Sequence, residues 1–246
     1  MLFGLFFGDW SVLLLIPAMI FAVWAQIRVK STFDKYDKIQ TMRRMTGADA
    51  ARRILDSNGL SDVKVEHVRG HLSDHYDPKA KVIRLSDATY DSTSVAALGV
   101  AAHEAGHAVQ HATGYVPIKI RSAIIPVTRF GSMLAMPLFF IGLLLTGYLS
   151  AEMDPIFGEY LMFGGILLFS FSTVFQLVTL PVEFNASKRA LETLSNSGYL
   201  YEDEITGARK VLTAAAMTYV AALATSLASL LRLILIASGA SGRRRR

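Results

Sequence analysis

The sequence predicts a mostly helical α+β membrane protein with about four transmembrane helices and a small β-hairpin or sheet in its water-exposed part. Hydrophobic residues make up 52% of the 246 residues and charged residues only 18%, whereas soluble domains carry about 25% charged residues. Two long segments, 130–150 and 160–182, contain no charged residue at all. The 28–129 block, in contrast, is polar and carries both helical and strand-like patterns.

Four segments are apolar enough to be interpreted as membrane spans, because about 20 apolar residues cross the hydrocarbon core. They are Trp10–Ile27, Phe130–Ser150, Tyr160–Val182 and Val211–Leu231. The first segment is preceded by Asp9 and by no basic residue, so we expect a retained anchor rather than a cleaved signal peptide. The fourth is rich in Ala, Thr and Ser, and it either crosses the bilayer, dips back or packs partly on the cytoplasmic part.

The distribution of Lys and Arg sets the expected orientation. Sixteen lie between Arg28 and Arg129 and four between Lys188 and Lys210, whereas the 151–159 loop has none. We therefore expect a multi-pass protein of a bacterial-type plasma membrane, with its N-terminus outside and residues 28–129 and 183–210 in the cytoplasm. If the fourth segment spans, the Arg243–Arg246 tail conflicts with this rule, and we interpret the tail as a topology signal or a lipid-headgroup contact.

The composition argues against nucleic-acid binding and excludes cross-links and metal sites that depend on cysteine. The net charge of +5 comes largely from the four terminal arginines, and no basic helix interleaved with aromatics occurs elsewhere, so we expect no nucleic-acid partner. The chain has no cysteine, which excludes disulfides and thiolate metal sites.

Local patterns in the 28–129 block predict a small α+β unit. A helix over Ala48–Ser57 shows apolar residues at i, i+3 and i+4 and should stop near Asn58-Gly59. Val63–Val68 and Lys81–Leu85 alternate as strands do, and turn residues Asp74, Asp77 and Pro78 lie between them. Ser92 or Ser94 should then cap a helix that runs to about Thr113 and ends at Gly114.

That last helix contains the sequence His103-Glu104-Ala105-Gly106-His107. Two histidines four residues apart lie on one helical face, so both imidazoles can bind one Zn²⁺. Glu104 lies about 100° around the helix, where it can take a proton from a zinc-bound water and return it to the leaving amine. Gly106 inside a helix costs about 1 kcal/mol relative to Ala, which indicates close packing or a close ligand.

Glu183 is the residue that we expect as the third ligand. His111 lies about 12 Å along the axis from His103, too far for the same metal. Glu183 is a lone carboxylate at the cytoplasmic end of a span, beside Pro181, which we expect to start a helix. A hairpin of two spans over 130–182 would return it to the face that carries the histidines. The alternative is a snorkelling or capping carboxylate.

Three motifs together resemble the YugP-type membrane zinc metallopeptidases. They are AAHEAGHAVQHATGY at 101–115, DHYDP at 74–78 and EFNAS at 183–187. The chain is more distantly similar to HtpX-type and CAAX-processing gluzincins. The resemblance implies a zincin-like core, one Zn²⁺ per chain held by His103, His107 and Glu183, and Glu104 as catalytic base. One departure is Ser187, where gluzincins often carry an Asp that supports a zinc histidine; Asn185 could substitute.

The expected organisation has five segments: an anchor at 1–27, a zincin-like catalytic segment at 28–129, a transmembrane hairpin at 130–182, the third-ligand helix at 183–210, and a C-terminal apolar helix with its Arg tail at 211–246. In zincins an edge strand beside the active-site helix binds the extended substrate. We expect Lys81, Val82, Ile83, Arg84 and Leu85 in this role, although the 70–86 stretch also fits an ordinary hairpin turn. His75, Tyr199 and Arg189 are the candidate oxyanion donors.

The sequence therefore predicts a membrane-embedded zinc metalloendopeptidase that cuts proteins or peptides near the cytoplasmic face of the bilayer. Two alternatives stay open. One is a site-2-type intramembrane protease, but His103–His107 is flanked by polar residues and the apolar spans of the 130–182 hairpin contain no Asp. The other is a non-catalytic scaffold stabilised by zinc, which would need no general base at Glu104.

Overall fold

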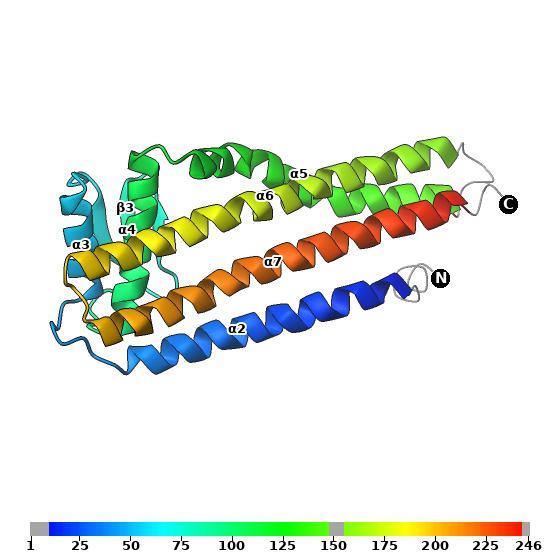
Figure 1. Ribbon diagram of the computed structural model, residues 1–246. Coiled ribbons are helices and arrows are strands. Elements are labelled where there is room, and N and C mark those ends of the chain that lie inside the picture. The colour runs from blue at the N-terminus through cyan, green and yellow to red at the C-terminus, as the bar shows by residue number, and fades with distance from the viewer. Residues whose placement is uncertain (1–9, 148–154, 243–246) are drawn as a thin grey trace. The chain divides into compact units, whose positions relative to one another are not determined.

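The structure is a computed structural model that describes residues 10–147 and 155–242 (Figure 1). Helices make up most of it, and a small three-stranded sheet lies between the third and fourth helices in the chain. The predicted fold class is thereby confirmed. In chain order the elements are η1 (Trp10–Leu14), α2 (Leu15–Asp37), α3 (Gly47–Ser57), β1 (Lys64–Val68), β2 (His75–Asp77), β3 (Val82–Ser86), α4 (Val95–Ala112), α5 (Val116–Gly147), α6 (Pro155–Asn196) and α7 (Glu202–Gly242).

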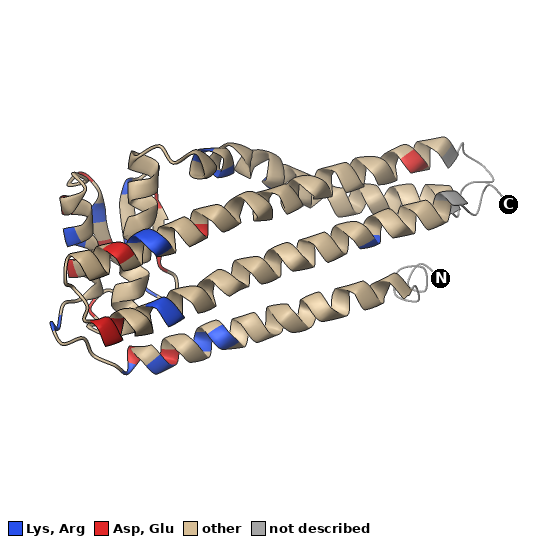
Figure 2. Cartoon of the chain, in the orientation of Figure 1, with Lys and Arg blue, Asp and Glu red and all other residues tan. Residues whose placement is uncertain are grey.

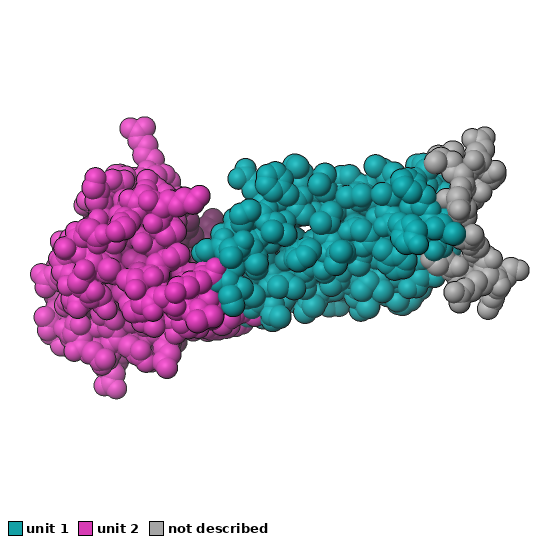
Figure 3. Space-filling model, turned by 90° about the horizontal axis from the view of Figure 1, so that it is seen from above, with its two compact units in different colours: residues 1–23, 120–178, 219–246 teal, residues 24–119, 179–218 magenta. Residues whose placement is uncertain are grey.

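The chain divides into two compact units (Figure 3). The first, unit 1, comprises residues 1–23, 120–178 and 219–246; the second, unit 2, comprises residues 24–119 and 179–218. Helices α5, α6 and α7 each contribute residues to both units. The five-segment division expected from the sequence stays a prediction.

Within residues 10–147 and 155–242, four helical stretches are long and apolar enough to cross a membrane, judged by length and composition: Trp10–Asp37, Val116–Thr146, Ile156–Asn196 and Glu202–Ala240. Long parts of α2, α5, α6 and α7 carry neither acidic nor basic residues (Figure 2). The helices extend beyond the expected spans, because the sequence analysis counted only the uncharged core of each. The expected helix start at Pro181 is wrong, since Pro181 lies inside α6.

Some predicted features fall on parts of the chain that the structure does not describe. They are the end of the second span at Ser150, the acidic loop residues Glu152 and Asp154, and the Arg243–Arg246 tail.

Within unit 1, glycines bring α5 and α6 close together. A Cβ atom on Gly165 would lie 2.6 Å from the carbonyl oxygen of Ala135, and one on Gly142 would lie 2.5 Å from the backbone nitrogen of Met162. Both distances are too short for a real side chain, so the backbones approach as closely as small residues allow. This is how transmembrane helices commonly pack when no hydrophobic force drives them together.

Within unit 2, the sheet has the strand order β1-β3-β2. Both predicted strands are present, within one residue of their expected starts. However, β1 runs parallel to β3 and therefore does not form a hairpin with it. The antiparallel partner of β3 is the short strand β2, which the sequence analysis interpreted as a turn. Three residues are too few to show the alternation that identifies a strand.

The core of unit 2 forms where α3 and α4 pack against the sheet. Ile83 and Leu85 point from one face of β3 into a cluster with Ile54 and Leu55 of α3 and Leu98 of α4, and all five are almost fully buried. Local signals set the helix ends. Thr46 and Asp49 form a reciprocal capping box at the start of α3. Ser94 caps α4 by accepting a hydrogen bond from the backbone N–H of Ala97.

Candidate metal centre

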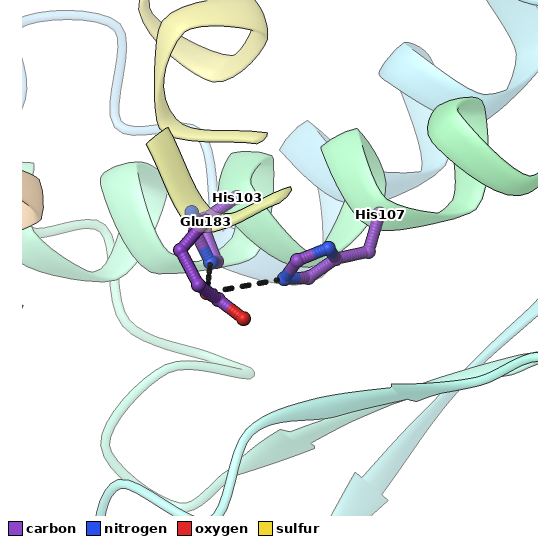
Figure 4. Close-up of side chains that lie close together, drawn as sticks. All are labelled: His103, His107 and Glu183. Carbon is purple, nitrogen blue, oxygen red and sulfur yellow. Dashed lines mark hydrogen bonds and ion pairs between the residues drawn. The ribbon is translucent and has the colours of Figure 1, made fainter. Parts of the chain in front are cut away.

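His103 and His107 of α4 converge with Glu183 of α6 (Figure 4). Oε2 of Glu183 lies 3.3 Å from Nε2 of His103 and 3.6 Å from Nε2 of His107. One potential ligand atom from each residue lies within 4.8 Å of the others. All three residues belong to unit 2. The structure thus brings together the three residues that the sequence analysis named as ligands.

The cluster is well shielded from solvent. The Glu183 side chain is 2% exposed, and the two imidazoles are 14% and 12% exposed. Glu104 is also buried, at 9% exposure. Among the residues that the structure describes, none forms a hydrogen bond or ion pair with the Glu104 carboxylate. A buried carboxylate without a partner is costly, so this group is suited to receive a hydrogen bond from a water or a substrate.

The donor set fits zinc. Two imidazole nitrogens and one carboxylate oxygen form the three-ligand set of many catalytic zinc sites, which keep a fourth position open. Ligand atoms about 2.1 Å from a tetrahedral zinc lie roughly 3.4 Å from one another. The distances of 3.3 and 3.6 Å from Glu183 to the histidines have this spacing.

The electrostatics of His107 reflect the same cluster. Burial lowers the pKa of His107, but the hydrogen bond to Glu183 and the negative charges of Glu104 and Glu183 outweigh it and leave the pKa raised. Protonation of His107 is therefore favoured by the two nearby carboxylates, Glu104 and Glu183. Because zinc binds only the neutral imidazole, metal binding must displace this proton.

Small residues let α4 and α6 approach each other at the centre. A Cβ atom on Gly106 would lie 2.9 Å from the carbonyl oxygen of Ala186, closer than side chains pack. Ala102 and Ala105 on α4 and Ala186 on α6 are fully buried. The close packing that Gly106 indicated in the sequence is thus a contact between two helices.

Each histidine has a second polar contact behind the cluster. Nδ1 of His103 lies 3.1 Å from the hydroxyl of Ser187, four residues after Glu183. Nδ1 of His107 donates to Oε1 of Gln110 at 3.0 Å. Asn185 contacts Gln110 rather than either histidine. Gln110 was not expected at the site from the sequence, although its place three residues after His107 puts both on one helical face.

The expected edge position of the substrate-binding strand is wrong. β3 is the central strand of the sheet, with β1 and β2 as its neighbours. A substrate-binding role for Lys81, Val82, Ile83, Arg84 and Leu85 stays a prediction. The edges belong to β1 and β2. Of these, β2 approaches α4, since the ring of Tyr76 lies 5.6 Å from that of His111, one turn beyond His107.

The role of the three candidate oxyanion donors stays a prediction, and each donor has contacts outside the cluster. His75 pairs with Arg84 on the sheet face opposite Ile83 and Leu85, and its Nδ1 donates to the carbonyl of Ser73. The guanidinium of Arg53 lies 6.0 Å from the Tyr199 ring centroid. The side chain of Arg189 donates to Asn185 and lines a cavity of about 350 Å³ whose lining includes none of the cluster residues.

The HEAGH helix, α4, is not one of the four apolar helices that the structure describes as long enough to span a membrane. The two histidines are therefore carried by α4, whereas Glu183 lies within the candidate span Ile156–Asn196 of α6.

Apolar helices long enough to cross a bilayer, combined with a buried cluster of two histidines and a glutamate that could hold a metal ion, indicate the class of multi-pass membrane metalloproteins. The family model described as "Putative neutral zinc metallopeptidase" matches residues 11–238, and the chain belongs to this family. It is 48% identical over 225 residues to the "Putative membrane protease YugP" of Bacillus subtilis (strain 168), an alignment that covers 92% of this chain and 95% of the relative. No solved structure matches the chain. The resemblance predicted from the three sequence motifs is confirmed.

Proposed function

We propose that the chain is a zinc metalloendopeptidase that hydrolyses peptide bonds of proteins or peptides at the cytoplasmic face of a bacterial-type plasma membrane. The observation that carries the proposal is the convergence of His103, His107 and Glu183 beside the buried carboxylate of Glu104. Membership of a zinc metallopeptidase family supports the same chemistry. In this proposal one Zn²⁺ per chain is held by the two imidazoles and the Glu183 carboxylate.

The roles proposed for zinc and Glu104 follow from the positions of the side chains. When bound, zinc supplies Lewis-acid polarisation of the scissile carbonyl and of the attacking water. Glu104 follows His103 directly, so its carboxylate points to the side of the two imidazoles and not between them. It accepts a proton from the attacking water and passes that proton to the nitrogen of the leaving amine. Burial strengthens this role, because little bulk water competes for the carboxylate.

Removal and restoration of the metal test the proposal. We expect the purified full-length protein to contain about one zinc per chain and to cleave an unfolded protein such as casein. A chelator such as 1,10-phenanthroline should abolish cleavage, and a stoichiometric amount of zinc should restore it. Cleavage that continues after the zinc has been removed would contradict the proposal.

The cytoplasmic placement of the site rests on the sixteen basic residues between Arg28 and Arg129. Because the chain has no cysteine, single cysteines report orientation cleanly. We expect Ser57→Cys, at an exposed position of α3, to react with a membrane-impermeant maleimide only after the cells are permeabilised. Ala151→Cys, between α5 and α6, should react in intact cells. The opposite pattern would place the site outside the cytoplasm.

A further inference from the structure

We propose that Gln110 is the positioning residue that fixes the tautomer and orientation of His107, and that Asn185 and Arg189 hold Gln110 in place. The proposal rests on the proposed zinc function, in which Nε2 of His107 faces the metal. Gln110 is fully buried, and its side-chain amide has hydrogen-bond contacts with His107, Val182 and Asn185.

The hydrogen bonds around Gln110 allow only one orientation of its amide. Nε2 of Gln110 lies 2.8 Å from the carbonyl oxygen of Val182 and 3.0 Å from Oδ1 of Asn185. A carbonyl oxygen can only accept, so the group that faces Val182 must be the NH₂. The oxygen of Gln110 must then face His107.

Arg189 independently fixes the orientation of the Asn185 amide, which makes the second contact with Gln110. Its Nε lies 2.9 Å from the side chain of Asn185 and can only donate, so the Asn185 atom between Arg189 and Gln110 must be the oxygen. That oxygen in turn requires the NH₂ of Gln110 opposite it. Two separate acceptors therefore point the Gln110 oxygen towards His107.

The consequence for His107 is a defined tautomer. Because Oε1 of Gln110 can only accept, Nδ1 of His107 must carry the proton. In the neutral imidazole, the other nitrogen, Nε2, then carries the lone pair on the side of Glu183, 3.6 Å away. This is the form that a metal binds, so the orientation is in place before the metal arrives.

His103 lacks an equivalent constraint. Its Nδ1 contacts the hydroxyl of Ser187 at 3.1 Å, and a hydroxyl can donate or accept. Ser187 therefore supports the ring position of His103 without dictating which nitrogen is protonated. Gln110 therefore restricts the tautomer of His107 more strictly than Ser187 restricts that of His103.

The arrangement also links metal binding to the docking of two helices. Gln110 and His107 lie on α4, whereas Val182, Asn185 and Arg189 lie on α6. Residues 182–189 of α6 thus supply Glu183 and also hold the amide that orients a histidine of α4. Loss of the Asn185 acceptor would leave the carbonyl of Val182 as the one α6 contact, among those that the structure describes, that holds the Gln110 amide in this orientation.

Zinc affinity of the full-length protein, measured by competition with a chromophoric chelator, tests the proposal. We expect Gln110→Leu and Asn185→Leu each to weaken zinc binding by about 10- to 100-fold, the usual effect of losing an outer contact to a ligand histidine. The visible absorption of the cobalt-substituted protein should shift in the same two variants, since it reports the ligand geometry. A role in folding alone would leave this spectrum unchanged in the folded fraction.

Two matched variants complete the experiment. Asn185→Asp keeps an oxygen that accepts from both Gln110 and Arg189, so it should retain the wild-type zinc affinity. Asn196→Leu makes the same change as Asn185→Leu at an exposed position of α6 and should also retain it. Thermal unfolding of the metal-free proteins identifies any variant that fails to fold.

The outcomes separate this proposal from the proposed function. If Gln110→Leu and Asn185→Leu bind zinc and cobalt as the wild type does, while Glu183→Ala loses both metals, the positioning role is wrong and the ligand set stands. If Asn185→Asp weakens binding as strongly as Asn185→Leu, the acceptor role of Asn185 is wrong. If Glu183→Ala binds zinc normally, the proposed ligand set itself fails.

Discussion

A Glu104→Gln variant is expected to lose peptide hydrolysis while it retains its zinc. The amide has nearly the shape of the carboxylate, but it cannot accept a proton from the attacking water. A positioned general base typically contributes 10²- to 10⁴-fold to a rate, so we expect a loss of about that size. Glu104 is not part of the ligand cluster, so the zinc content should stay near one per chain.

The measurement pairs the initial rate of casein cleavage with the zinc content of the same samples. Glu192→Gln makes the same substitution at an exposed carboxylate of α6 that pairs with Lys188, and it should leave the rate unchanged. If zinc is bound and Glu104→Gln cleaves at the wild-type rate, Glu104 is not the base. If zinc is bound and neither protein cleaves any substrate, the non-catalytic scaffold replaces the enzyme as the better account.

A Glu183→Ala variant is expected to lose zinc altogether at stoichiometric concentrations. The substitution removes one of the three proposed protein ligands and also the buried negative charge beside two histidines. Loss of an outer contact costs up to about 100-fold in metal affinity, and loss of a ligand should exceed that. Hydrolysis should disappear together with the metal.

Zinc titration followed by calorimetry measures this effect, with Glu192→Ala on the same helix as the matched control. The metal-free variant should still fold, because its core of α3, α4 and the sheet is unchanged. A variant that keeps stoichiometric zinc with wild-type affinity would remove Glu183 from the ligand set.

The parts of the structure that depend on local sequence were predictable. The cap at Ser94 and the positive-φ glycine at 114 bound α4 as expected, because each acts within a few residues. The spacing of His103 and His107 depends only on helical geometry. The prediction of Glu183 required one further step. Two apolar segments, each long enough to cross the bilayer, return the chain to the side that carries the histidines.

The parts that depend on distant contacts were not predictable. The parallel pairing of β1 with β3 and the insertion of β2 at the edge are set by packing between segments, and no pattern within either strand encodes them. Proline favours the first position of a helix, yet α6 continues through Pro181. Gln110 has a role only because Val182 and Asn185 of another helix lie beside it.

The central claim is that His103, His107 and Glu183 hold a single zinc ion, and the position of that ion tests it most directly. Anomalous diffraction from crystals of the zinc-loaded protein, recorded on both sides of the zinc absorption edge, locates the ion without reference to activity. We predict one peak per chain, about 2.0–2.2 Å from Nε2 of each histidine and from a Glu183 oxygen. A peak ligated by other residues, or a protein that takes up zinc without placing it between α4 and α6, would contradict the account.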